Sequence, residues 1–431
     1  MREMKDSGIE WIGIIPKGWN ISRLKYIAKF FNGDRGKNYP SGEDLVDDGI
    51  AFLTSNNIHG IVLDCSQEKS KFITEERYNR LGGAKIQLND IAFCLRGSVG
   101  NCAINKTLTK GTVASSLMII RPIKASSDFI NYVLQTDVCD VQTIKAMNGS
   151  CAANLSAENV SNYYFVEPSI VEQKKIAIFL DSKCSEIDAI SADIQKEIEI
   201  LEHYKRSVIT EAVTKGLNPD AEMKDSGVAW CPQIPSHWQY SNPKGLFGLR
   251  TDRAFRDDRQ LTASQEYGIV YQGEYMEKTG NKVVTVTKDF SILKHVEPDD
   301  FVISMRSFQG GLEYSDKRGC ISSAYVMLIP NKEFVYAPFY RWFFKSSKYI
   351  NALQSTSNLV RDGQAMRYAN FVKVPLFIVP IEEQKAIASY LDEKIEKVNS
   401  ILAAKKKQLE ILSNYKKSLI YEYVTGKKEA T

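Results

Sequence analysis

Apolar residues recur with a helical period over two long stretches of the chain. The first stretch, residues 169–216, begins with Ser169 and Glu172 in the spacing of a capping box. The second, residues 380–426, begins after Pro380 and has acidic residues in its first turn. Each stretch ends on a glycine and predicts a helix of about 45 residues, or about 65 Å. Helices of this length must bury a seam against another part of the protein.

Both stretches carry two apolar stripes that repeat every seven residues in the same phase. The predicted seam comprises Ile187, Ile194, Ile198, Leu201 and Val208 in the first helix and Ile395, Val398, Leu402, Leu409, Leu412 and Leu419 in the second. Lysines 205, 405 and 416 interrupt these stripes. Because the chain must return to the start of the second helix, we expect an antiparallel intramolecular coiled coil. The alternative is that each helix packs separately on its own globular domain.

Between the helical stretches, short apolar runs alternate with turn residues. IAFCL precedes Arg96-Gly97, and FVISM precedes Arg306-Ser307. A short capped helix is expected within residues 74–83. We predict an α/β (α+β) fold with two mixed α/β domains that contain twisted sheets. The expected domain bounds are 1–168 and 217–379, and the expected helix bounds are 169–216 and 380–426.

The chain also repeats itself. MKDSGIEWIGIIPKGW at 4–19 returns as MKDSGVAWCPQIPSHW at 223–238, with nine identities and no gap at an offset of 219. EQKKIAIFLDSK at 172–183 returns as EQKAIASYLDEK at 383–394, at an offset of 211. Fainter likenesses join residues 90–100 with 300–310 and 111–122 with 319–330. The pattern indicates duplication of a whole domain with its helix, and it predicts a pseudo-twofold symmetric molecule.

Composition and charge place the chain among multidomain globular proteins. Its 431 residues are 43% hydrophobic, and a net charge of +4 means that any basic surface must be local. Neither a secretory signal nor an apolar run of membrane-spanning length is visible, so we expect a cytoplasmic location. The eight cysteines include no C-x-x-C pair, which predicts reduced, buried thiols and no zinc site.

Catalytic motifs are absent from the sequence. There is no phosphate-binding G-x-x-x-x-G-K-[ST] loop, no [DNS]-P-P-[YF] methyltransferase signature and no H-E-x-x-H metal motif. His59, His203, His237 and His295 stand in unrelated contexts, which argues against a Ser/His/Asp constellation. The sequence therefore favours a non-catalytic protein. An enzyme with an unfamiliar site would need convergent titratable groups in one domain.

Three motifs that each occur twice carry a family likeness: W-x-G-x-I-P-x-G-W, E-Q-x-x-I-A-x-x-L-D and Y-K-x-S-L-I-x-x-x-V-T-G. In this order they resemble the specificity (S) subunit of Type I restriction-modification systems over essentially the whole chain. The second copy departs at Cys231-Pro232, where the first copy has Ile-Gly, and Lys215 replaces the glycine of the last motif in the first copy.

The resemblance implies a DNA-binding subunit with two target-recognition domains, each of which reads one half of a split, asymmetric site. The helices would measure the unspecified spacer, because a stiff connector fixes the distance between two groove-reading modules. Two modification (methyltransferase) subunits would bring S-adenosylmethionine and adenine methylation and would dock on exposed helix faces. Two restriction (endonuclease and translocase) subunits would bring ATP- and Mg-dependent cleavage. This chain would hold no cofactor and no metal.

Base contacts are expected from basic, non-repeated loops, because residues shared by both domains cannot distinguish two targets. The candidates for DNA contact are Arg35, Lys37, Asn38, Lys106 and Lys110 in the first domain and Arg250, Arg253, Arg256, Arg259, Arg361, Gln364 and Arg367 in the second. Arg96 and Arg306 occupy equivalent strand ends, so phosphate contact or loop structure suits them better. Any of these residues alone could instead be a solvated surface charge.

Two further alternatives concern aromatic residues and overall role. The paired tryptophans Trp11/Trp19 and Trp230/Trp238 could stack on bases, but their Ile-Pro neighbours favour structural anchoring. A coiled-coil scaffold with two domains that bind something other than DNA is the rival functional class. Such a scaffold would show no salt-dependent binding to duplex DNA.

Overall fold

The computed structural model describes residues 2–147, 155–286, 290–304, 307–356 and 366–430. The chain forms two compact units. Unit 1 combines Met1–Ile194 with Lys407–Thr431, and unit 2 is Gln195–Lys406. Both boundaries between the units fall inside the two long helices, so each unit holds one end of each helix.

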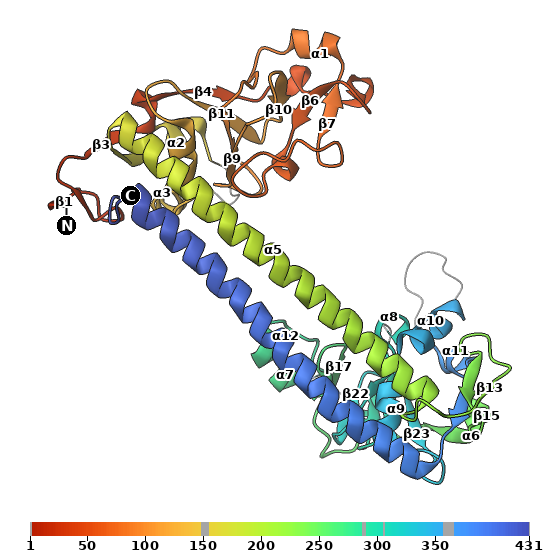
Figure 1. The fold of residues 1–431 in the computed structure, drawn as a ribbon. Helices are drawn as coiled ribbons and strands as arrows, with labels where there is room; N and C mark the ends of the chain where they lie inside the picture. Colours follow the sequence, from red (N-terminus) through yellow and green to blue (C-terminus); the bar gives the residue numbers. More distant parts are fainter. Residues whose placement is uncertain (1, 148–154, 287–289, 305–306, 357–365, 431) are drawn as a thin grey trace. The chain divides into compact units, whose positions relative to one another are not determined.

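Unit 1 is a mixed α/β unit built on two four-stranded sheets (Figure 1). The first sheet is antiparallel, with the order β4 (Ala28–Asn32), β11 (Leu117–Pro122), β8 (Ile91–Cys94) and β9 (Cys102–Ile104). The second has the order β10 (Gly111–Val113), β6 (Ile50–Leu53), β7 (Lys71–Ile73) and β5 (Leu45–Val46), with a parallel β10–β6 pair. The helices are α1 (Glu75–Arg80), α2 (Ser127–Leu134), α3 (Asp137–Met147) and α4 (Ala157–Ser161).

Two short strand pairs complete unit 1. β1 (Met4–Asp6) pairs with β2 (Ile14–Pro16), and β3 (Asn20–Arg23) pairs with β12 (Tyr164–Glu167). Since β3 and β12 enter and leave the globular part of the unit, their pairing closes it at its base. The short helix expected within residues 74–83 is α1, and the Thr74 hydroxyl caps it by accepting from the Arg77 backbone N–H at 3.2 Å.

Unit 2 repeats the first sheet with the same strand order, β16 (Phe247–Arg250), β23 (Val326–Pro330), β20 (Phe301–Ile303) and β21 (Glu313–Tyr314). The short pairs recur as β13 (Met223–Asp225) with β14 (Gln233–Pro235) and β15 (Gln239–Ser241) with β24 (Leu376–Ile378). In place of the second sheet, unit 2 has β17 (Leu261–Ser264) with β18 (Gly268–Tyr271) and β19 (Lys294–Val296) with β22 (Gly319–Ile321). Its helices are α6 (Pro243–Leu246), α7 (Gln272–Thr279), α8 (Ser307–Gly310), α9 (Ala337–Phe343), α10 (Ser347–Ser355) and α11 (Tyr368–Phe371).

The long helices are α5 (Ile170–Lys215, 46 residues) and α12 (Ile381–Val424, 44 residues). Ser169 caps α5, and its hydroxyl accepts from the Glu172 backbone N–H at 3.3 Å. The start of α5 and the end of α12 both join the core of unit 1, while the end of α5 and the start of α12 join the core of unit 2. Each helix therefore packs on globular domains as well as on its partner helix.

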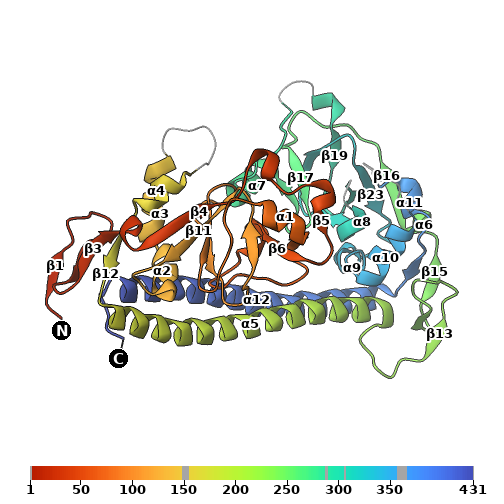
Figure 2. The ribbon, with the colours of Figure 1, turned by 90° about the horizontal axis from the view of Figure 1, so that it is seen from above.

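Within unit 1 the two helices lie side by side and run in opposite directions (Figure 1, Figure 2). Near the start of α5, Phe179 stacks on Tyr423 with ring centroids 4.4 Å apart. Further along α5, Asp188 accepts from the Lys416 ammonium at 2.6 Å. Residues further along α5 therefore contact residues nearer the start of α12, so the two helices are antiparallel.

Unit 2 shows the same relation between the other two helix ends. Glu197 pairs with Lys405, and Lys205 donates to the Asn399 side-chain oxygen at 2.7 Å. The lysines that interrupt the apolar stripes are therefore neutralised or hydrogen-bonded at their tips while their stems stay half-buried. Of the predicted seam, Ile187, Ile198, Ile395, Val398, Leu402 and Leu419 are buried and Ile194, Leu201, Val208, Leu409 and Leu412 are half-buried.

The repeated tryptophans anchor the helix starts. The indole N–H of Trp19 donates to Glu172 at 3.2 Å, and that of Trp238 donates to Glu383 at 3.0 Å. Trp19 is 3% exposed and Trp238 is fully buried, so neither ring offers a face to a base. The anchoring interpretation is confirmed for this pair.

A glycine ends each long helix against one of these anchors. Gly216 and Gly426 both have positive φ, 75° and 73°. A Cβ on Gly426 would lie 2.5 Å from the Pro16 ring, and one on Gly216 would lie 2.8 Å from the Glu383 carboxylate. The backbone turn requires glycine at both positions, and at Gly426 the close contact with Pro16 requires it as well.

Candidate nucleic-acid interface

In unit 1 the first basic loop lies between β4 and β5. The Asp34 carboxylate accepts from the Gly83 backbone N–H at 2.7 Å and fixes the base of this loop. Arg35 and Lys37 are exposed, and neither forms an ion pair with any residue that the structure describes. The side chain of Asn38 lies outside the described part of the chain. Two free cations on a fixed loop suit contact with an anionic backbone.

The other unit 1 candidates have protein partners. Lys106 pairs with Asp128 at 2.5 Å and with the Asn89 side chain at 3.1 Å. Lys110 pairs with Glu75 on α1. These pairs are exposed and weak, so the lysines can exchange them for phosphates. Arg96 is half-buried after β8, and its backbone N–H donates to the Ser116 carbonyl at 3.3 Å.

In unit 2 a single segment carries three of the candidates. This segment, residues 251–260 between β16 and β17, is named the arginine loop below. Arg253, Arg256 and Arg259 on it are all exposed. Arg253 donates to the Ile292 carbonyl at 3.2 Å, and the Arg259 guanidinium lies 3.7 Å over the Tyr271 ring. Arg256 forms no ion pair within the described part of the chain.

Arg250, just before this loop, is held inside the protein. Its guanidinium donates twice to Asp300, at 2.6 and 3.0 Å, and the Asp300 side chain is 1% exposed. Burial raises the pKa of Asp300, and the bidentate pair with Arg250 opposes that shift. These two hydrogen bonds already engage donors of Arg250, which disfavours its use for base contact. The role of Arg250 in base contact stays a prediction.

Unit 1 satisfies the equivalent buried carboxylate from a different strand. Asp90 accepts two hydrogen bonds from Arg121 on β11, both at 2.7 Å. The strand registers place Phe31 of β4 opposite Ile119, at the position that Arg250 occupies in β16. Both units therefore keep the buried carboxylate. The arginine that pairs with it comes from β11 in unit 1 and from β16 in unit 2.

We expect Arg250→Met to lower the free energy of unfolding by about 3 kcal/mol, because it leaves the Asp300 carboxylate buried and unpaired. Arg256→Met is the matched control: it removes the same group from an exposed position and is expected to change stability by less than about 0.5 kcal/mol. Urea unfolding of both variants gives the comparison. Equal losses from the two substitutions would contradict the assignment of a buried pair.

The remaining candidates lie near or beyond the described ranges. Arg367 is exposed at the start of α11, and its backbone N–H donates to the Asn370 side chain at 3.2 Å. Arg306, Arg361 and Gln364 lie outside the residues that the structure describes.

One titratable cluster was not expected. The His295 ring has two carboxylate partners that were not predicted, because its two nitrogens lie 2.7 Å from Asp258 and 2.7 Å from Glu297. Arg318 joins the cluster by pairing with Asp257 at 2.8 Å. Asp258 lies 37 positions before His295, so periodicity could not reveal their contact.

Arg318 could have been found by comparing the repeats. It precedes Gly319 as Lys110 precedes Gly111, and Lys110 was already a candidate for DNA contact. Both residues pair with an acidic residue of a neighbouring segment, Asp257 and Glu75 respectively. The equivalence places a basic residue at the same turn of both units.

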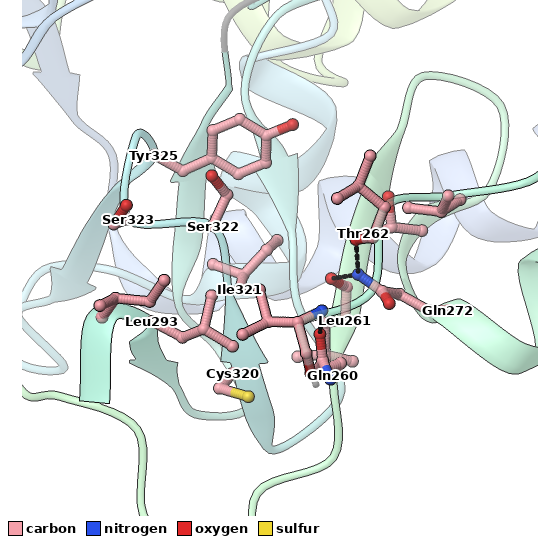
Figure 3. A pocket seen from close by; sticks show the side chains of 14 residues that line it. Gln260, Leu261, Thr262, Gln272, Leu293, Cys320, Ile321, Ser322, Ser323 and Tyr325 are labelled. Carbon is pink, nitrogen blue, oxygen red and sulfur yellow. Dashed lines mark hydrogen bonds between the residues drawn. The ribbon is translucent and has the colours of Figure 1, made fainter. Parts of the chain in front are cut away.

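A pocket of about 350 Å³ lies beside the arginine loop in unit 2 (Figure 3). Gln260 and Gln272 line one side of it, and Ser322 and Tyr325 line another. Burial raises the pKa of the Cys320 thiol at its edge to about 11, so this thiol is protonated at neutral pH and is a poor nucleophile. The described residues that line it include no carboxylate and no histidine.

Over the described ranges, no three His, Cys, Asp or Glu side chains are grouped so as to hold a metal ion. In the same ranges, no helix has both the length and the apolar composition needed to cross a bilayer. Two duplicated α/β units with exposed basic loops define the class as a two-domain recognition protein.

Comparison with known proteins identifies the family. The sequence model of the type I restriction modification DNA specificity domain matches residues 16–200 and 235–411. The chain therefore belongs to the type I restriction-modification DNA specificity family, and the resemblance inferred from the repeated motifs is confirmed.

Curated relatives match the chain over all or half of its length. The chain is 23% identical over 442 residues to the putative type I restriction enzyme MjaX specificity subunit of Methanocaldococcus jannaschii, covering 96% of this chain and 95% of that protein. It is 27% identical over 208 residues to the type I restriction enzyme EcoKI specificity subunit of Escherichia coli K12, covering 47% and 44%. The expected class, a specificity subunit and not a catalytic one, is the class to which these relatives belong.

A solved structure shares the fold. One chain from a study of complex assembly and conformational transition of the type I R-M system superposes with a TM-score of 0.69 at 15% identity, covering 96% of this chain and 99% of that one. At this identity the likeness supports the fold: a mixed α/β chain with long helices.

Proposed function

We propose that this chain is the DNA-recognition subunit of a type I restriction-modification complex and that its two units read the two halves of a split, asymmetric site. Family membership supports DNA specificity, and the duplicated sheet with non-repeated basic loops supports two different targets. The carrying observation is that Arg253, Arg256 and Arg259 are exposed on the loop after β16 in unit 2, while unit 1 exposes Arg35 and Lys37, in a different sequence, on the loop after the equivalent strand β4. Arginine in such loops reads guanine edges or phosphates.

The two helices act in this proposal as an antiparallel coiled coil that sets the spacer between the half-sites. The opposed contacts within each unit and the burial of the seam support this role. A helix pair resists bending where a flexible linker would not, so the separation of the two readers is fixed. The repeated Trp–Glu anchors at both helix starts support a pseudo-twofold arrangement.

Exposed apolar side chains on the long helices support docking of partner subunits. Ile178 on α5 is 70% exposed, Ile200 is 68% exposed, and Ile411 on α12 is 57% exposed. Docking of a partner on the helices would remove these side chains from water. In the proposed complex two modification subunits bind here, with two restriction subunits added to them. S-adenosylmethionine, ATP and Mg belong to those subunits, and the location is cytoplasmic.

Methylome sequencing tests the proposal. Cells that express this chain with its neighbouring methyltransferase gene are expected to show adenine methylation at one split motif, and deletion of the chain is expected to abolish it. A methyltransferase-only strain is the control. Methylation that is unchanged by the deletion would contradict the proposed function.

A further inference from the structure

The arginine loop is not part of any sheet, yet it is fixed along its whole length. At its start, Arg250 is locked to Asp300. In its first half, the Ala254 backbone N–H donates to the Leu293 carbonyl at 3.2 Å. At its end, the Gln260 side chain both donates to and accepts from the backbone of Val286, at 2.8 and 2.9 Å.

The middle of the loop turns around one buried carboxylate. Asp258 Oδ2 accepts from the Phe255 backbone N–H at 2.8 Å and lies 2.7 Å from His295 Nδ1. His295 is 1% exposed, and its ring lies 4.4 Å from the Phe255 ring. The imidazole therefore joins the inner side of the loop to β19, while the neighbouring Arg256 side chain is exposed.

Both nitrogens of the His295 ring face carboxylate oxygens, because Glu297 lies 2.7 Å from Nε2. The imidazole therefore lies between one carboxylate of the loop and one that follows β19. Arg318 closes the cluster from outside: it pairs with Asp257 at 2.8 Å and lies 3.6 Å from Glu297. Charged hydrogen bonds shielded from water are stronger than exposed ones.

Unit 1 has no such cluster in the corresponding place. The strand pairing His295↔Cys320 of unit 2 corresponds to the bridge Lys85↔Thr112 of unit 1. Lys85 lies over the Tyr78 ring at 4.8 Å and has no ion pair within the described ranges. The cluster therefore belongs to the non-repeated part of the chain, where target specificity must reside.

We propose that Asp258, His295, Glu297 and Arg318 form a clamp, with Asp258 and His295 buried at its centre, that holds the arginine loop in its DNA-contacting conformation, so that His295 is a positioning residue for the half-site read by unit 2. This inference rests on the proposed function. It names the residues that hold the DNA-contacting loop of one of the two recognition units. A loop ordered before binding loses less conformational freedom on binding, which favours affinity and sequence discrimination.

The test uses the full chain in complex with its modification subunits and three duplexes: the cognate site, and sites with either half-site scrambled. His295→Gln and Glu297→Ala break the clamp, while Glu297→Gln keeps an acceptor for the imidazole. We expect the first two variants to lose about 5- to 100-fold in affinity for the cognate site, the range for losing one base contact. Glu297→Gln should bind within about twofold of the unaltered chain, because its amide oxygen still accepts.

The loss is expected only in discrimination at the half-site of unit 2; discrimination at the half-site of unit 1 should stay as it is. Arg256→Ala is the matched control, because it removes a loop cation and leaves the clamp intact; it should also reduce the salt slope of binding by about 1. If Arg256→Ala weakens binding while His295→Gln and Glu297→Ala do not, the clamp is overturned and the proposed function stands. If no duplex binds specifically, the proposed function itself fails. The Glu297 side chain is 38% exposed, so we expect the Glu297→Ala variant to fold. If His295→Gln does not fold, Glu297→Ala alone decides the test.

Discussion

Replacing residues 24–163 by the matching segment of another family member is expected to change one half of the methylated motif and to leave the other half unchanged. The graft ends lie at a natural joint, because β3 pairs with β12 at the base of unit 1. The exchange also spares Trp19, which anchors α5 through Glu172. The second unit therefore keeps its own contacts, and the graft must retain Ser126 and Tyr132, which contact Gln173 and Asp181 of α5.

Methylome sequencing of the chimera measures this outcome, and the reciprocal exchange of residues 242–375 in unit 2 is the control, since β15 and β24 pair in the same way. Each exchange should alter a different half of the motif and keep the spacer. A chimera in which both halves change together would show that the two units do not read independently.

Adding one heptad to each long helix is expected to lengthen the unspecified spacer by roughly three base pairs. Seven residues add about 10.5 Å of helix, against about 3.4 Å per base pair of DNA. Insertions after Ile194 in α5 and after Lys406 in α12 fall at the boundaries between the units, so each unit keeps its own helix contacts. Whole heptads preserve the phase of the seam.

A heptad inserted in α5 alone is the control. It shifts the α5 seam against α12, so that Lys405 no longer faces Glu197, and it should lower stability without giving a new motif. Sequencing of methylated sites reports the spacer in each case. A double insertion that leaves the spacer unchanged would show that the helices do not set the distance.

The helices were the most predictable part of the fold, because their signals are local. Ser169, the glycines that end the helices and the seven-residue repeat all act within a few turns, and α5 and α12 lie inside the ranges expected from them. The duplication was equally visible, because the anchor segments kept their residues. The second sheet of unit 1 could not be predicted from the repeat, because unit 2 has separate strand pairs in its place.

The candidate interface was predictable as a set of loops and not as a set of contacts. Sequence alone ranks Arg250 with Arg256, yet one is locked to Asp300 and the other is exposed. The distinction depends on a strand pairing that brings together residues 50 positions apart. Comparison of the two repeats could not make this distinction either, because in unit 1 the equivalent carboxylate pairs with Arg121 from another strand. His295 was missed for the same reason, since Asp258 reaches it through the fold.

The most direct test of the two-reader account is the affinity of the purified chain with its modification subunits for duplexes whose spacer varies one base pair at a time. Readers held on a stiff helix pair predict one preferred spacer length. A change of two base pairs should weaken binding about 100-fold or more, because one half-site then loses its base contacts. An affinity that stays level across the spacer series would contradict the account.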